Sequence, residues 1–192
     1  EARAYYGKYP DKTRLVVEPV LDALAPVLDR RLPAAFDASL SVQISRALDL
    51  AKEFNLDPIV VGAAEAGLVA GDLKAAGARV IYSLNFPTPP ETGRGGRGAG
   101  RGAAAAAGEG QEETMRGRRA RQNAPKGPAA LSAAGVPFAF TSGGLQDLSL
   151  FMKNAAKTVK DGSLAPDQAL AALTSGAAAI AGVANRLGTL QP

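Results

Sequence analysis

Short apolar runs alternate with helical patterns along most of the chain, and this alternation constrains the fold more than any other feature of the sequence. The segment Pro58–Ala63 is apolar without alternating polar positions, which is typical of a strand buried on both faces of a sheet. Segments 32–38, 78–84 and 136–142 also have strand character. Strands separated by single helices indicate βαβ units, so we expect an α/β fold with about four parallel strands and flanking helices.

Helical patterns lie between these strands. Apolar residues Ile44, Leu48 and Ala51 recur at helical spacing, and Ser39 or Ser41 can cap the helix that contains them. Further helices are expected to begin near Pro19, Glu65, Pro128, Leu148 and Pro166, and two of them to end at Gly77 and Gly135. Four strands are half the number in a (β/α)8 barrel. Length alone is compatible with a partial TIM barrel or with a small open α/β sheet.

Composition excludes several classes of site. The 192 residues include no cysteine and no histidine. The chain therefore has no disulfide, no thiolate or imidazole metal ligand and no Ser-His or Cys-His pair, unless a second chain supplies histidines. The lack of cysteine leaves the redox compartment undetermined.

The ends of the chain and its apolar segments bear on localisation. No apolar stretch is long enough for a membrane anchor, and the first residues lack the pattern of a signal peptide. The chain begins at Glu1 without a methionine and ends at Pro192 soon after a glycine turn. We therefore expect it to be a piece of a longer polypeptide.

The positive charge is concentrated in one segment. The chain has a formal net charge of +4, and segment 91–127 alone contains eight bases and four acids, a surplus equal to that charge. Segment 87–127 is rich in Gly, Arg and Ala and offers little to bury, so we interpret it as a disordered insertion.

Two nucleotide-related interpretations of this insertion have less support than a disordered loop. An RGG-type nucleic-acid segment is one alternative, but no Phe or Tyr is interleaved with its arginines. The spacing of Gly93, Gly95 and Gly98 matches a dinucleotide fingerprint, yet prolines precede it instead of a strand. We therefore do not expect nucleic acid to be a partner.

Polar residues follow the four predicted strands. Asp37, Glu65, Asn85 and Ser142 would lie at the carboxyl edge of a parallel sheet, where ligands bind in such folds. Asp37 and Glu65 could be paired carboxylates for acid/base chemistry or for a hard cation. Alternatively, each caps the helix that follows it. Asn85 and Ser142 are candidate ligand-binding residues that could equally be turn formers.

The C-terminal residues resemble the amidohydrolase superfamily. Segments 168–174, 177–183 and 186–192 are similar to the last barrel helices of that family, and Val136–Gly144 resembles its eighth strand in the imidazolonepropionase-like branch. Segments 32–38, 59–63 and 80–84 then resemble strands five, six and seven. The resemblance implies that residues 1–192 form one partial barrel domain, the C-terminal half, interrupted by the insertion at 87–127.

The resemblance also implies a chemistry. Amidohydrolases are metal-dependent enzymes that hydrolyse C–N bonds with divalent ions such as zinc, held partly by His on strands five and six and by Asp on strand eight. In this sequence Asp37 stands where the family has the first of these His residues, Val61–Ala63 ends the sixth strand without His, and Gly143 replaces the Asp. We therefore expect no metal or other cofactor held by this chain itself.

Three functional hypotheses follow. The first is a catalytically degenerate amidohydrolase fragment whose partners are the N-terminal half of the barrel and the β-sandwich of the same protein. The second is an active hydrolase in which Asp37 and Glu65 form an altered site with residues outside this chain. The third is an RGG-type nucleic-acid-binding protein. The open strand edges also allow a homo-oligomer.

Overall fold

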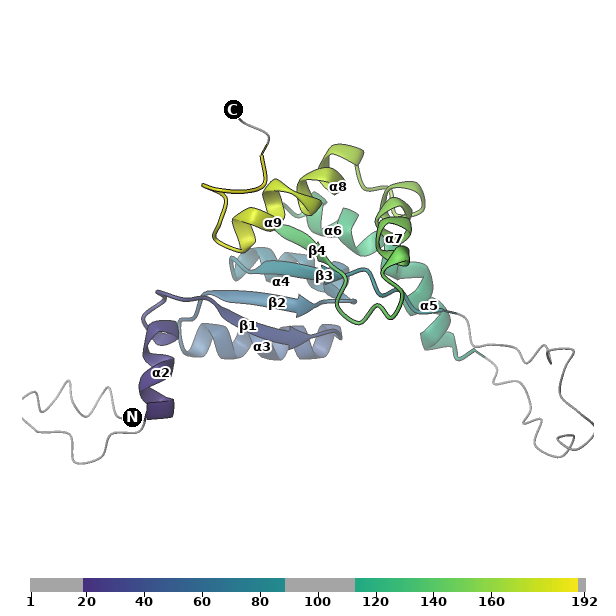
Figure 1. Cartoon of the computed structure of the whole chain (residues 1–192). Helices are drawn as coiled ribbons and strands as arrows, with labels where there is room; N and C mark the ends of the chain where they lie inside the picture. The colour runs from purple at the N-terminus through teal and green to yellow at the C-terminus, as the bar shows by residue number, and fades with distance from the viewer. Residues whose placement is uncertain (1–18, 89–112, 190–192) are drawn as a thin grey trace, which may run out of the picture.

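The computed structural model describes residues 19–88 and 113–189, which build a four-stranded parallel sheet (Figure 1). The strands are β1 (Ala34–Ala38), β2 (Pro58–Gly62), β3 (Arg79–Ser83) and β4 (Phe138–Thr141), in the spatial order β1-β2-β3-β4. Each strand falls inside a segment predicted from the sequence. The α/β class with four parallel strands is confirmed, and the architecture is that of a partial (β/α)8 barrel.

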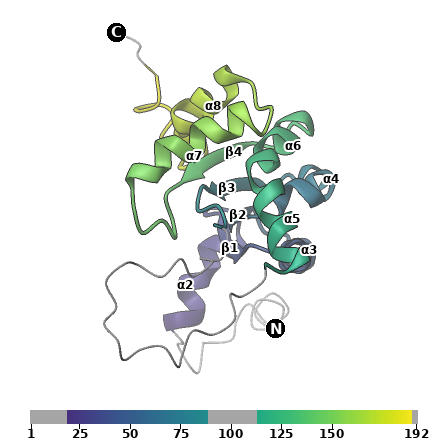
Figure 2. The ribbon, with the colours of Figure 1, turned by 90° about the vertical axis from the view of Figure 1, so that its right-hand side faces the viewer.

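Helices connect the strands and cover mainly one face of the sheet (Figures 1 and 2). They are α2 (Pro19–Leu28), α3 (Ser41–Glu53), the 3₁₀ turn η1 (Ala66–Val69), α4 (Ala70–Ala75), α5 (Met115–Asn123), the 3₁₀ turn η2 (Ala124–Lys126), α6 (Gly127–Ala133), α7 (Ser149–Lys160), α8 (Pro166–Leu173) and α9 (Ser175–Ile180). Figure 1 shows α3 and α4 behind the sheet, whereas the face toward the viewer carries no helix over β1 and β2. We call the helix-covered side the outer face and the opposite side the inner face.

The outer face carries the main core. Val60, Val80 and Tyr82 are each 0% exposed and belong to one cluster with Ile44 of α3 and Leu73 of α4. Val60 pairs in register with Val80, so the two side chains lie on the same face of neighbouring strands. Apolar side chains from helix and strand thus interdigitate here, as in other layered α/β folds.

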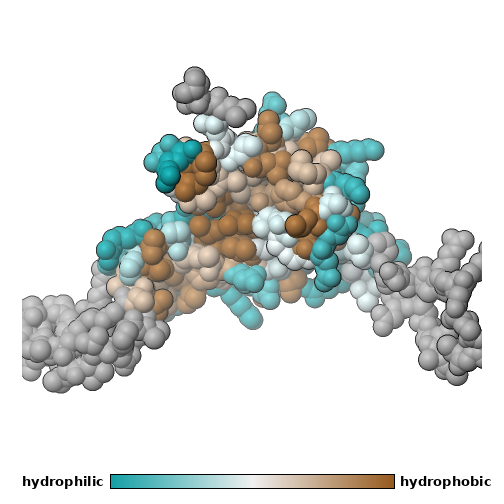
Figure 3. Space-filling view, viewed as in Figure 1, coloured by the Kyte–Doolittle hydropathy of each residue, from teal (hydrophilic) through white to brown (hydrophobic). Residues whose placement is uncertain are grey.

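The inner face has a much smaller core. Asp37, Val61, Ile81 and Ala139 form one register row across the sheet. Only Ala139 of this row is buried, in a small cluster with Ile59 and Ile180. Val61 and Ile81 are half-buried and Asp37 is exposed. Figure 3 shows apolar surface across the centre of this face.

Glycines end the helices before β3 and β4, as the sequence predicted. Gly77 and Gly135 have positive φ values of 63° and 68°, which glycine adopts without steric cost. The residue after each glycine donates a backbone hydrogen bond back into its helix, Ala78 to Leu73 O at 2.9 Å and Val136 to Leu131 O at 3.0 Å. This arrangement satisfies the last carbonyls and directs the chain into the next strand.

Part of the predicted disordered insertion is helical, so that prediction is wrong for residues 115–127. The Thr114 side chain accepts a hydrogen bond from Gly117 N at 3.1 Å and caps α5, and arginine is a good helix former. Averaging the composition over 87–127 hid this local signal. Residues 89–112, with the Gly-Arg run and the dinucleotide-like spacing, lie outside the described residues.

Within the two described ranges, none of the helices combines the length and hydropathy that a membrane span requires.

Candidate functional site

Asp37 lies exposed at the end of β1. Gly62, with a φ of 87°, lies beside it, and a Cβ added there would stand 3.4 Å from Asp37 Oδ1 and 2.9 Å from Ser39 Oγ. Within the described part of the chain the Asp37 side chain makes no hydrogen bond or ion pair. It therefore does not cap α3, in contrast to one of the two sequence interpretations.

Glu65, by contrast, is engaged. Its Oε2 accepts hydrogen bonds from the backbone N and the Oγ of Ser41, both at 2.9 Å, and its Oε1 lies 4.0 Å from Arg116 Nη2. Ser41 is the first residue of α3, so Glu65 caps the preceding helix and not the following one. The two carboxylates predicted to form a pair, Asp37 and Glu65, share no hydrogen bond. The paired-carboxylate site remains a prediction.

Asn85 and Ser142 lie in the turns that follow β3 and β4. The backbone N of Asn85 donates to Ser83 Oγ at 3.2 Å, and Ser83 Oγ donates to Gly143 O at 2.8 Å. Ser142 O accepts from Leu145 N at 2.9 Å. These bonds join the two turns and give both residues a role in turn geometry. Their role in ligand binding stays a prediction.

Zinc, which the family resemblance implies, does not fit the residues present. The preferred zinc ligands, His and Cys, are absent from the whole chain. In the described ranges no three acidic side chains come close enough together to hold an ion. Of the two carboxylates at the strand ends, Glu65 already accepts two hydrogen bonds from Ser41. The strand ends of this chain therefore offer at most one free carboxylate, Asp37, to a cation.

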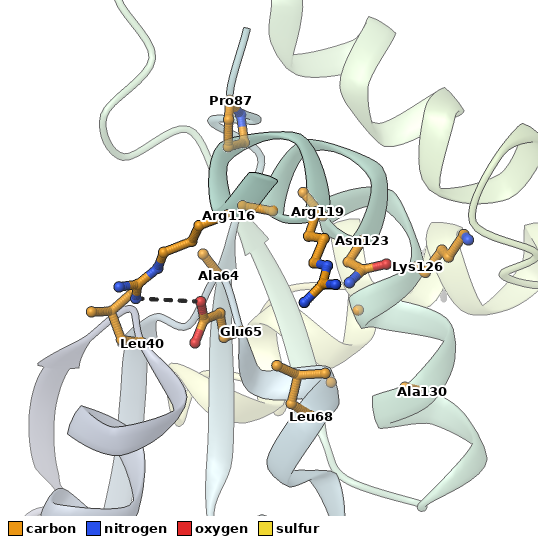
Figure 4. Close-up of a pocket in the computed structure, with 14 residues that line it drawn as sticks. Leu40, Ala64, Glu65, Leu68, Pro87, Arg116, Arg119, Asn123, Lys126 and Ala130 are labelled. Carbon is orange, nitrogen blue, oxygen red and sulfur yellow. Dashed lines mark ion pairs between the residues drawn. The ribbon is translucent and has the colours of Figure 1, made fainter. Parts of the chain in front are cut away.

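A pocket of about 600 Å³ opens beside the carboxyl ends of the strands (Figure 4). It lies between the loops after β1, β2 and β3 on one side and α5, η2 and α6 on the other. Its lining includes Leu40, Glu65, Leu68, Arg116, Arg119, Asn123 and Lys126. Among the four predicted site residues only Glu65 lines it, so this pocket was missed by the sequence analysis.

One face of α5 forms the basic wall of the pocket. Arg116, Arg119 and Asn123 recur at positions i, i+3 and i+7 and line it together. The other face carries Arg121, whose Nη2 lies 2.7 Å from Glu113 Oε2, and Arg118, whose Nε lies 3.6 Å from the same atom. The hydrogen bond from Arg121 is the main cause that lowers the pKa of Glu113. The helical spacing after Thr114 is the sequence signal that could have found this wall.

Buried contacts fix the back of the pocket. The Tyr82 hydroxyl donates to Ala124 O at 2.7 Å, with Ala64 O at 3.2 Å as a second acceptor, and burial raises the pKa of Tyr82 well above its ordinary value. A Cβ at Gly127 would lie 2.5 Å from Tyr82 Oη, and one at Gly67 would lie 2.9 Å from Gly127 Cα. Close packing of this kind holds the loop after β2 against α6.

These elements define half of an α/β barrel: four parallel strands with helices on the outer face and loops gathered at the carboxyl edge. The fold resembles a solved structure described as an amidohydrolase from Thermotoga maritima MSB8, with a TM-score of 0.70 and 19% sequence identity. The match covers 100% of this chain and 43% of that chain, so this chain spans less than half its length. No protein-family model matches the chain, and no curated protein matches it.

Proposed function

We propose that the chain is the C-terminal half of an amidohydrolase-like barrel that has lost the residues of a hydrolytic metal centre. The observation that carries the proposal is the set of groups at the strand ends. They are one unengaged carboxylate at Asp37, one carboxylate at Glu65 that caps α3, and the turn residues Asn85 and Ser142. Metal-bound hydroxide needs several ligands and a general base, which these groups do not supply.

The uncovered inner face supports the barrel assignment. β1 pairs only with β2 among the described strands, so in the described part of the chain its other edge has no strand partner. Val61 and Ile81 leave apolar surface on the same side. In a closed barrel, further strands would cover both. The proposed partner is thus the N-terminal half of a barrel, together with the β-sandwich that the resemblance implies; the imidazolonepropionase-like branch is likewise part of the proposal.

An active hydrolase is the second candidate. One observation favours it: Asp37 is exposed at a strand end, and its side chain makes no hydrogen bond or ion pair with the described residues. In such an enzyme Asp37 would join ligands that lie outside this chain. This candidate predicts a His-x-His pair, after a short apolar strand, in the part of the barrel that this chain does not supply.

Metal titration of the chain tests the proposal. Isothermal titration with Zn²⁺ and with Mn²⁺ should show no saturable binding at one equivalent, for wild type and for Asp37→Asn alike. Carboxylate oxygens alone favour harder ions and hold zinc weakly. A stoichiometric site that Asp37→Asn abolishes would overturn the degenerate-barrel proposal and establish Asp37 as a metal ligand.

A further inference from the structure

Arg119 on the basic wall of the pocket has no ionic partner among the described residues. The neighbouring arginines are engaged, Arg118 and Arg121 with Glu113 and Arg116 with Glu65. Figure 4 shows the Arg119 guanidinium directed into the space beside Asn123 and above Leu68. A guanidinium in this position, with five donors in a planar fork, is suited to bind an anionic oxygen pair.

The opposite wall of the pocket is apolar. Leu68 is 68% exposed and Leu40 is 37% exposed, and both line the cavity. Ala64 adds to this wall, and Ala120 of α5 and Ala130 of α6 add apolar surface on the side of the basic wall. Large apolar side chains in a concave site gain free energy when a ligand removes them from water. The pocket therefore presents one charged contact and a larger hydrophobic one.

The charge of the lining favours an anion. Arg116, Arg119 and Lys126 carry three positive charges, against one negative charge on Glu65. Glu65 is already neutralised in part by Arg116 and by its hydrogen bonds from Ser41. Lys126 extends away from the cavity in Figure 4 and contributes only at longer range. A bound anion would thus meet Arg119 first, with no carboxylate left free to repel it.

The pocket is also held in shape before any ligand binds. Tyr82 ties Ala64 O and Ala124 O together beneath it, and Gly127 is packed against the Tyr82 ring. These contacts fix the back of the pocket, so little conformational entropy is lost there on binding. Helix α5 buries none of its own residues and is joined to this fixed part through η2, which follows it directly in the chain.

We propose that this pocket binds a small organic anion with an apolar body, such as an aryl or branched alkyl carboxylate. The carboxylate forms a bidentate hydrogen-bonded pair with Arg119, and the Asn123 amide lies beside it. The apolar body covers Leu40 and Leu68. This binding does not depend on a metal centre, and its test is separate from the metal titration above.

The probe is 2-naphthoate, titrated calorimetrically into the full chain, with neutral 2-naphthamide as its isosteric control. We expect saturable binding of the acid at one equivalent and affinity for the amide at least about tenfold weaker, the effect of losing one charge-assisted contact. Equal affinity for acid and amide would overturn the proposal, because it would show apolar adsorption alone. No saturable binding to a chain with native circular dichroism would also overturn it.

Two variants on the same helix locate the site. Arg119→Gln should weaken 2-naphthoate binding about tenfold, whereas Arg118→Gln, the same change on the opposite face, should leave it unchanged. Equal losses in both variants would mean that only the net charge of α5 matters and would contradict the site. If Arg119→Gln fails to fold, the comparison of acid and amide on wild type decides.

A single-stranded RNA oligonucleotide completes the test as a competitor. We expect it not to displace 2-naphthoate at equal concentration, because the cavity is lined by one apolar wall and has no exposed aromatic ring for base stacking. Displacement by RNA that Arg119→Gln abolishes would overturn the small-anion proposal in favour of nucleic acid.

Discussion

The two faces of the sheet are built from neighbouring residues of the same strands but differ in burial. Val60 and Val80 on the outer face are each 0% exposed, whereas Val61 and Ile81, the next residue in each strand, are half-buried on the inner face. In β2 and β3 the central positions on both faces are apolar, which is typical of strands covered on both sides. The difference teaches that the centre of the sheet has the sequence of a doubly covered sheet, while the described elements cover mainly one face.

Removing core volume from the outer face should have the largest effect. Leu73 of α4 is 0% exposed, and Leu73→Ala should lower the free energy of unfolding by about 2–5 kcal/mol. Leu68→Ala, at a residue with 68% exposure, should change it by less than about 0.5 kcal/mol. Urea denaturation followed by circular dichroism measures both. Similar losses would show that the outer face is not the main core.

Overpacking the outer face should have the next largest effect. Gly127→Ala places a Cβ 2.5 Å from Tyr82 Oη, and the resulting shift should cost about 1–3 kcal/mol. Gly71→Ala is the matched control, since nothing lies within 4 Å of a Cβ there. In the helix α4 it should stabilise the chain by up to about 1 kcal/mol. Thermal melts that rank the two variants in the opposite order would contradict the packing described for Tyr82.

The buried hydroxyl on the outer face should contribute less. Tyr82→Phe removes the hydrogen bonds to Ala124 O and Ala64 O and should cost about 0.5–1.5 kcal/mol, or somewhat more because the acceptor at Ala124 is buried and loses its donor. Ser83→Ala, on the adjacent inner-face position, removes the bond to Gly143 O and the bond from Asn85 N, both in exposed turns, and should cost less because water can replace them. A larger loss for Ser83→Ala would reverse the proposed ranking of the two faces.

The smallest effect concerns pH. The hydrogen bond from Arg121 lowers the pKa of Glu113 below its ordinary value of 4.5. A lowered pKa in the folded state gives stability that is present above the ordinary value and is lost as the pH falls through the folded-state value. Helix signal should therefore decrease below about pH 4.5, and less so in Glu113→Gln. Asp147→Asn is the comparison at a second site: the pKa of Asp147 is lowered by Ser149, the first residue of α7, so this variant should keep the pH-dependent loss at α5.

Much of the fold could be predicted from the sequence because its signals are local and periodic. The continuous apolar run at Pro58–Gly62 and the glycines at 77 and 135 determine a buried strand and two helix ends. Helix α5 was not predicted because the Gly- and Arg-rich composition of the whole segment masks its local signal. That signal is the N-cap at Thr114. The candidate site was predicted only in part, since Glu65 lines the pocket but Arg119 does not follow a strand.

The roles of site residues depended on contacts that no sequence pattern specifies. Glu65 caps α3, which precedes it by a full strand, because the parallel register places the loop after β2 beside Ser41. A residue that caps the helix directly after it lies at a fixed position before that helix in the sequence, so a sequence pattern can predict it. A residue that caps an earlier helix has no such fixed position. The pocket likewise needs Tyr82 and Gly127, which are distant in sequence and meet only in the folded chain.

Sedimentation velocity of the isolated chain tests the half-barrel account most directly. The account predicts self-association that grows with concentration, because β1 has an open edge and the inner face leaves Val61 and Ile81 partly exposed. The double variant Val61→Ser and Ile81→Ser should reduce this association while the outer core keeps its circular dichroism. A monodisperse wild-type monomer with one cooperative unfolding transition would contradict the account and identify the chain as a self-contained open α/β sheet.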